Sequence, residues 1–402
     1  MESNYEFSFF TNILLLLVFS KIFGELFERW KQPAMIGEII AGIILGPTIF
    51  NLVHKSTEIK AISEIGIFFL IIIAGLEIKV KDVIDSLRGK EVFISIMAFV
   101  LPILSGFLIG YFFKIDYLST IFISLCIAIT ALPVSIRILM DIGILNTDIG
   151  KKIISVAIFD DVISFVILGL ILNLNRANSS LQEIVNVSLS SLLKLSIFLL
   201  ILFASYKFMN KSAKNENFTK WLFVKWLKNL KSKEARLTIL IIFILSFAIT
   251  TEYLGFHFII GAFFAAMLLN ENLIDQKNVE LFKEKTNGIT LGFLAPIFFA
   301  GIGLELNILS IKNYWLLFFI LFASIFTKTI GGFIGSKIAG FTNKKSLTIG
   351  LGLNARGIME IVIANIAYKS GFINVEIFSM LIIMGVFTTI FTPFLLKNAI
   401  RN

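Results

Sequence analysis

The chain has few charged residues for its length and very little cysteine or histidine. Charged residues make up 16% of its 402 residues, whereas a soluble domain carries roughly a quarter. The single cysteine, Cys126, excludes a disulfide framework, and two distant histidines, His54 and His257, provide too few ligands for a zinc site. Because no nucleophile or metal cluster stands out either, we expect neither an enzyme nor a resident cofactor.

What the chain has in excess is apolar surface. Hydrophobic residues account for 57% of it, and its mean hydropathy is +0.91. About thirteen apolar segments follow one another, most of them near the ~20 residues that a membrane-spanning helix needs. The sequence therefore predicts an all-α integral membrane protein with about 13 transmembrane helices, at residues 8–28, 34–50, 59–78, 91–113, 118–141, 150–174, 185–206, 237–252, 255–270, 287–306, 313–336, 346–368 and 374–396. The first has no small-residue cleavage site, so we expect an extra N-terminal helix and not a signal peptide.

The net charge of +9 is distributed unevenly along the chain. Lysine and arginine are frequent in every second connection between the segments and sparse in the others. The connection from Lys207 to Arg236 holds nine of them, for example, and the next connection holds none. This alternation is the positive-inside pattern. It predicts a cell-membrane protein with the N-terminus outside and the C-terminus in the cytoplasm, and it explains the basic charge without nucleic-acid binding.

A linker at residues 185–252 separates two halves of the chain. Within it, residues 218–231 combine Trp221 and Trp226 with several lysines. Such a mixture is typical of an amphipathic helix that lies in the interface of a bilayer. We therefore expect this segment to rest on the membrane surface and to contact lipid.

The two halves resemble each other. Residues 74–78 (AGLEI) recur as residues 302–306 (IGLEL), and the charge pattern places the two copies at opposite sides of the membrane. We expect residues 1–402 to form one transporter domain that contains two inverted five-helix repeats, at residues 34–174 and 255–396. Inverted repeats of this kind bind ions near the bilayer midplane, between interrupted helices.

Helix-breaking residues lie at equivalent positions in the two repeats. Pro133 interrupts the first, directly after Thr130 and Ala131, because proline removes a backbone donor and disfavours helix before it. Asn354 lies 224 positions after Thr130, and Gly357 weakens the helix there. The sequence predicts two crossed discontinuous helices, whose free carbonyls and helix ends form a cation site.

Charged residues inside apolar segments mark the centre of this site. Asp160 and Asp161 lie near the middle of the sixth segment, where each buried carboxylate needs a proton, a cation or water. Lys328 lies equally deep and is the candidate basic partner, with Gly331, Gly332 and Gly335 allowing close helix approach around it. Arg356 and Glu360 are four residues apart, so we expect them to pair and to stabilise the interruption.

A buried carboxylate that holds either a proton or a metal cation, but never both, exchanges the two across a membrane. With these motifs the chain resembles the monovalent cation:proton antiporters of the NapA and Kef type over nearly its whole length. The stretches that carry the resemblance are TALPVSIRILMDIGIL, FDDVISFV, GLEIK, the helix of Lys328 and LNARGIMEIVIANIA.

The resemblance implies roles for individual residues. Asp161 would bind the cation, Na⁺ or Li⁺, and Asp160 would pair with Lys328 when the cation is absent. Thr130, together with Ala131, Pro133 and Asn354, would shape the site and help coordinate the cation. An Asp-Asp pair with such a lysine implies electrogenic exchange, in a homodimer whose core domain moves against a dimerisation domain. Such transport serves pH homeostasis.

Two departures from the family pattern keep alternatives open. Ile358 and Met359 separate Arg356 and Gly357 from Glu360, as in the potassium-handling branch that includes plant exchangers, so K⁺/H⁺ exchange is the second hypothesis. Few residues follow the last helix, so we expect no cytosolic regulatory domain. A Na⁺-coupled symporter of an organic anion is the alternative from another class, although it would place amides and hydroxyls, not an acid pair, at the crossing.

Overall fold

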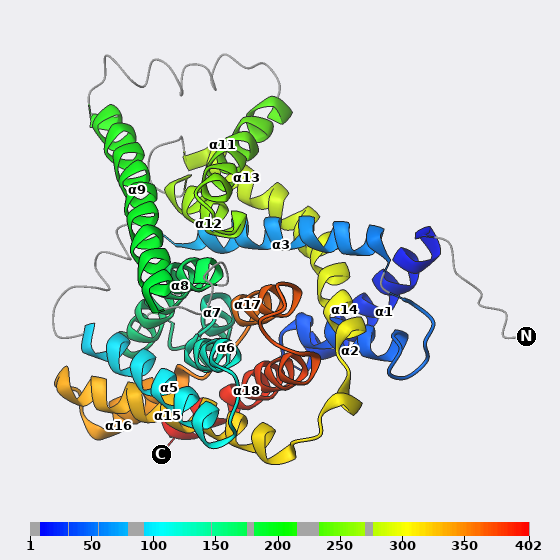
Figure 1. Cartoon of the computed structure of the whole chain (residues 1–402), viewed down its shortest axis with the longest axis vertical. Helices are drawn as coiled ribbons and strands as arrows, with labels where there is room; N and C mark the ends of the chain where they lie inside the picture. The colour runs from blue at the N-terminus through cyan, green and yellow to red at the C-terminus, as the bar shows by residue number, and fades with distance from the viewer. Residues whose placement is uncertain are drawn as a thin grey trace, which may run out of the picture. The chain divides into compact units, whose positions relative to one another are not determined.

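The computed structural model describes residues 9–30, 32–54, 56–78, 92–145, 147–174, 181–214, 233–269 and 276–401. These residues form helices and connecting turns, with no strand in the described ranges. Figure 1 traces the helices along the chain. In the first half they are α1 (Phe9–Arg29), α2 (Ala34–Leu45), α3 (Thr57–Glu77), α5 (Val92–Phe112), α6 (Tyr117–Ala128), α7 (Leu132–Ile142), α8 (Asp148–Leu174) and α9 (Leu181–Lys214). In the second half they are α11 (Lys233–Tyr253), α12 (Phe258–Leu269), α13 (Gln276–Ile289), α14 (Ala295–Glu305), α15 (Tyr314–Ile338), α16 (Asn343–Gly352), α17 (Ile358–Lys369) and α18 (Val375–Arg401).

Each predicted apolar segment coincides with one helix or with a pair of consecutive helices. Among the described residues, nine helical stretches are long and apolar enough to cross a membrane, and three shorter apolar helices accompany them. The all-α membrane fold is thus confirmed, while the count of thirteen crossings stays a prediction. The predicted interfacial segment at residues 218–231 lies outside the described residues.

One predicted segment differs in an informative way. The sequence predicts a span at residues 287–306, but the helix begins at Gln276, as α13, and passes through a π-helical turn at Thr290–Leu294 into α14. Pro296, near the start of α14, has no backbone N–H to donate, which favours a local change of helix type. Lys283 and Lys285 therefore lie on a helix and not in a connection.

The chain divides into two compact units. The first contains residues 1–67, 83–161 and 291–402, and the second contains residues 68–82 and 162–290. The first unit thus combines helices from both predicted repeats, including both pairs of interrupted helices. The boundaries of the repeats themselves remain a prediction.

Small residues allow the helices of the first unit to pack at short distances. A Cβ atom on Gly42 of α2 would collide with the Ala300 carbonyl group of α14. Gly331 and Gly335 of α15 lie in the same way against the backbone of α5, and Gly332 lies against Gly350 of α16. The predicted close approach of helices around Lys328 is therefore confirmed, and it fixes α15 beside α5 and α16.

The second unit packs α11 and α12 closely, with further contacts from α9. A Cβ atom on Gly261 of α12 would collide with the Phe247 carbonyl group of α11. The Phe165 and Phe263 rings lie 4.5 Å apart between their centroids. Apolar side chains such as Leu189 and Leu200 of α9 remain exposed, which suits a surface that faces lipid.

Candidate ion-binding site at two crossed interrupted helices

The two interruptions lie against each other and share hydrogen bonds. The backbone is extended from Ile129 to Ala131, between α6 and α7, and a second irregular stretch separates α16 from α17. The Ala131 N–H donates to the Ala355 carbonyl at 2.8 Å, and the Thr130 hydroxyl donates to the Leu353 carbonyl at 3.0 Å. The helix breaks predicted 224 residues apart therefore meet at one crossing.

Pro133 and Gly357 create this geometry for different reasons. Pro133 occupies the first turn of α7, where its missing N–H leaves no helical hydrogen bond unmade. Gly357 has a φ of 179°, an extended conformation that any residue adopts. A Cβ atom there would lie only 2.8 Å from the Ala131 Cβ and from a methyl group of Val134. The sequence interpretation of Gly357 as a helix-weakening residue was thus incomplete, because the crossing backbones need its lack of a side chain.

Helix ends of both signs meet at the crossing. The helices α6 and α16 end there, and α7 and α17 begin there, so their last carbonyl groups and first N–H groups have no partner within their own helix. A helix C-terminus carries partial negative charge and an N-terminus partial positive charge. The ends of α6 and α16 therefore attract positively charged and hydrogen-bond-donating groups.

Asp160 and Lys328 form a buried ion pair beside these ends. The Lys328 Nζ lies 2.6 Å from Asp160 Oδ2, and neither side chain is exposed. The same ammonium donates to the carbonyl of Ala128, the last residue of α6. The Thr130 side chain lies beside the Asp160 carboxylate. A buried pair needs such additional hydrogen bonds, because removing two charges from water costs several kcal/mol per ion, about as much as their attraction returns.

Asp161 follows in the same helix and is 1% exposed. Successive side chains of a helix point roughly 100° apart, so the two carboxylates face different surroundings. The Asp161 carboxylate also interacts electrostatically with Lys328. The structure thus brings Asp160, Asp161, Lys328 and Thr130 together, as the resemblance implied.

Arg356 binds the end of α6 from the other interruption. Its guanidinium donates to the carbonyls of Cys126, Ile127 and Ile129, and to that of Ser324 at 3.2 Å. Its Nε lies 4.0 Å from Glu360 Oε2, the outer limit of an ion pair. The sequence predicted the contact with Glu360, and the structure shows that helix capping is the larger part of what Arg356 does.

Asn354 caps the other carbonyl end. Its Nδ2 donates to the carbonyls of Gly350 and Leu351 in α16, and to the Thr329 hydroxyl at 2.8 Å. Its Oδ1 is buried and accepts no hydrogen bond from the described residues. An amide oxygen of this kind is a suitable ligand for Na⁺ or K⁺, whereas Ala131 and Pro133 can contribute only backbone carbonyls.

Two hydroxyl groups and one backbone carbonyl at this site were missed in the sequence. Thr329 contacts Asn354, Ser324 provides a carbonyl to Arg356, and the Thr389 hydroxyl of α18 donates to the Arg356 carbonyl at 2.9 Å. Serine and threonine are frequent in apolar helices, where they bind the preceding turn. In the sequence, the closeness of Thr329 and Ser324 to Lys328 within α15 is a signal for these two residues, and Thr389 has no such signal.

Comparisons with known proteins cover nearly the whole chain. A family model described as "Sodium/hydrogen exchanger, transmembrane" matches residues 14–398. The Na⁺/H⁺-K⁺ antiporter GerN of Bacillus cereus is 27% identical over 98% of this chain and 96% of its own length. The Na⁺/H⁺ antiporter NhaS4 of Synechocystis is 27% identical over 99% and 98%.

A solved structure resembles the fold over the same extent. The sodium proton antiporter MjNhaP1 from Methanocaldococcus jannaschii superposes with a TM-score of 0.69 and 16% sequence identity. The match covers 97% of this chain and 96% of that one. At this identity the likeness establishes the fold.

Proposed function

The chain belongs to the sodium/hydrogen exchanger family, and we propose that Asp161 is the residue at which its cation and its proton compete. Family membership makes the chain a multi-span membrane protein that exchanges monovalent cations for protons. The leading cation is Na⁺, with Li⁺ as a substitute. Cation and proton are transported substrates here, and the exchange needs no further cofactor.

The observation that carries the proposal is the buried Asp160–Lys328 pair, adjacent in sequence to Asp161 and located at the crossing. Asp160 is paired with Lys328, and the buried Asp161 beside this pair is the carboxylate to which we assign the transported ion. The Thr130 hydroxyl and the Asn354 Oδ1 supply neutral oxygens of the kind that a hard monovalent cation prefers.

Charge balance determines how many protons are exchanged. One proton for one Na⁺ moves no net charge, so electrogenic exchange requires a second proton-carrying group. We assign this role to Lys328, whose ammonium can lose a proton when a cation on Asp161 repels it. Asp160 then holds a negative charge beside the bound cation and stabilises it.

Potassium is the second candidate cation. GerN is named a Na⁺/H⁺-K⁺ antiporter. The two residues between Gly357 and Glu360 agree with the potassium-handling branch. The hypothesis of a Na⁺-coupled organic-anion symporter finds no support in the family match.

Orientation and assembly complete the proposal. The distribution of lysine and arginine supports an N-terminus outside and a cytoplasmic C-terminus in the cell membrane. The resemblance supports a homodimer. Cysteine accessibility at each terminus and the mass of the detergent-purified protein test the two statements.

Proton movement in proteoliposomes tests the function itself. Na⁺, Li⁺ and K⁺ are added in turn to vesicles that contain a pH-sensitive dye. We expect Na⁺ and Li⁺ to drive proton release from the wild type and no response from Asp161→Asn, which keeps the side-chain size but cannot exchange a proton. A response to K⁺ alone would assign the chain to the potassium branch, and full exchange by Asp161→Asn would remove Asp161 from the site.

A further inference from the structure

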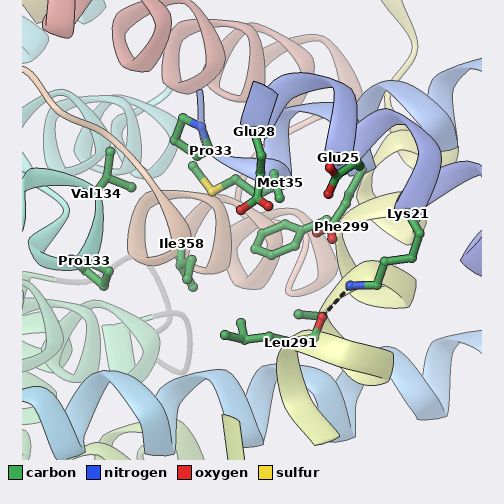
Figure 2. Close-up of a pocket in the computed structure, with 14 residues that line it drawn as sticks. Lys21, Glu25, Glu28, Pro33, Met35, Pro133, Val134, Leu291, Phe299 and Ile358 are labelled. Carbon is green, nitrogen blue, oxygen red and sulfur yellow. Dashed lines mark hydrogen bonds between the residues drawn. The ribbon is translucent and has the colours of Figure 1, made fainter. Parts of the chain in front are cut away.

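A cavity of about 420 Å³ lies in the first compact unit, next to the crossing. Figure 2 shows Pro133, Val134 and Ile358 towards one side of it and Lys21 with Glu25 towards the other. Pro133 and Val134 belong to the first turn of α7, and Ile358 is the first residue of α17. The cavity therefore ends at the two helix starts that follow the interruptions.

Three carboxylates and one ammonium group line this cavity. Glu25, Glu28 and Lys21 come from the exposed face of α1, and Glu38 comes from α2. The Lys21 ammonium donates to the Leu291 carbonyl at 2.7 Å, so it is held at the π-helical turn (Figure 2). The cavity carries a net negative charge, which concentrates cations near its walls.

Glu38 differs from the other two glutamates in its depth. It is only 5% exposed, although it lies in a helix that is otherwise apolar. Gly24 of α1 lies beside it, at a distance where a Cβ atom would make an ordinary contact of 3.5 Å with the Glu38 side chain. Glu38 is thus buried where α1 packs against α2.

No hydrogen bond or ion pair joins Glu38 to another described residue. Lys21 and Glu28 interact with Glu38 electrostatically, with opposite signs. A carboxylate this deep needs a proton or a cation, and its side chain lines a cavity that has room for a cation. A mobile positive charge can therefore occupy this place.

We propose that Glu38 is a second cation site, which binds the transported monovalent cation transiently between solvent and the crossing. This inference rests on the proposed exchange function and extends it to a residue outside the crossing. The cation loses part of its hydration shell at Glu38 and then passes Pro133 and Ile358 to reach Asp161. Glu38 thereby raises the cation concentration that Asp161 meets, and it takes no part in the competition with protons there.

Half-saturating Na⁺ concentrations measured in proteoliposomes test this role. We expect Glu38→Gln to raise the half-saturating concentration by about tenfold, with the maximal rate unchanged, since a local negative charge accelerates cation arrival by about this factor or more. Glu38→Asp keeps the charge and should restore the affinity to within about twofold. Glu252→Gln, at the exposed end of α11, is the control that removes one carboxylate elsewhere.

Adding the salt of a bulky organic cation distinguishes the effect of Glu38 on Na⁺ affinity from the effect of the exposed charges. Such a salt screens Glu25 and Glu28 at the surface, but a buried charge is screened much less. The difference between wild type and Glu38→Gln should therefore persist at high ionic strength. A difference that disappears with salt, or a loss of maximal rate at unchanged affinity, would overturn the proposal.

Direct binding provides a second measurement that does not depend on transport. In the Asp161→Asn protein we expect residual weak Na⁺ binding by ²³Na NMR relaxation, and the absence of any residual binding would overturn the inference even if Glu38→Gln failed to fold. An active wild type with an unchanged Glu38→Gln variant would refute this inference alone. A wild type without cation-driven proton movement would refute the exchange function and this inference together.

Discussion

Lys328 and Arg356 bind the same end of one helix. Lys328 donates to the carbonyl of Ala128, and Arg356 donates to the carbonyls of Cys126, Ile127 and Ile129. Two positive charges from α15 and from the second interruption thus neutralise the partial negative charge at the C-terminus of α6. The crossing depends on both, and each can be tested separately.

Replacing Lys328 by alanine should destabilise the protein and alter charge movement. The substitution leaves the Asp160 carboxylate buried without its ammonium partner, which costs about 3–5 kcal/mol. Thermal unfolding in detergent measures the loss, and the membrane current in proteoliposomes shows whether exchange becomes electroneutral. Lys337→Ala, on the exposed end of the same helix, should change neither quantity. Unchanged stability and current in Lys328→Ala would contradict the assigned pairing.

Arg356 and Glu360 should differ in their effect on stability. Arg356→Lys keeps the charge but loses the planar fork that reaches several carbonyls, so we expect a loss of about 3 kcal/mol. Glu360→Gln should cost less, because its nearest guanidinium atom is 4.0 Å away. Denaturant or thermal unfolding of both variants and of the double variant gives the comparison. A larger loss for Glu360→Gln would show that pairing, and not capping, is the main role of Arg356.

Gly357→Ala should disturb the crossing through volume alone. The added methyl group would meet Ala131 and Val134 at 2.8 Å, and overpacking of this kind costs about 1–3 kcal/mol. Ala131→Gly removes one of the two obstacles, so the double variant should recover part of the stability. Gly288→Ala in α13 is the matched control, because a Cβ atom there would meet no atom of a neighbouring element within 4 Å. If Gly357→Ala is as stable as Gly288→Ala and the wild type, the crossing is not tightly packed.

Exchange should increase with pH. Protons and cations compete for Asp161, so a proton occupies the site at low pH and the cation gains access as the proton concentration falls. Where Asp161 is mostly protonated, the half-saturating Na⁺ concentration should fall by about tenfold per pH unit, more steeply where Lys328 releases a second proton, and then level off. Initial rates measured at equal internal and external pH, from about pH 6 to about pH 9, test this. A flat profile would rule out simple competition.

Much of this architecture is readable from the chain because membrane burial makes polar residues conspicuous. Pro133 and the 224-residue offset to Asn354 indicate both interruptions, and Asp160 and Lys328 are identifiable because charge is costly in an apolar helix. Whether such charges meet in space depends on how the helices pack. The glycines of α15 indicate a close approach of helices but not which residues it brings together.

Other features depend on contacts that no local pattern specifies. The carbonyls that Arg356 binds lie about 230 residues away in the chain, and this partnership exists only once the interruptions cross. Glu38 is a single carboxylate near the predicted start of its segment, where it could equally face solvent. The contact of Lys21 with a carbonyl of the π-helical turn likewise joins residues 270 positions apart.

The crossing also sets an order for the biogenesis of this protein. Asp160 and the end of α6 leave the ribosome long before the residues that neutralise them, because Lys328 follows Asp160 by 168 positions and Arg356 comes later still. A nascent chain that has inserted only as far as α9 therefore exposes an unpaired charge and free carbonyls within the bilayer. Completion of α15 to α17 removes this defect, so quality-control machinery that detects polar groups in the membrane can tell unfinished chains from finished ones.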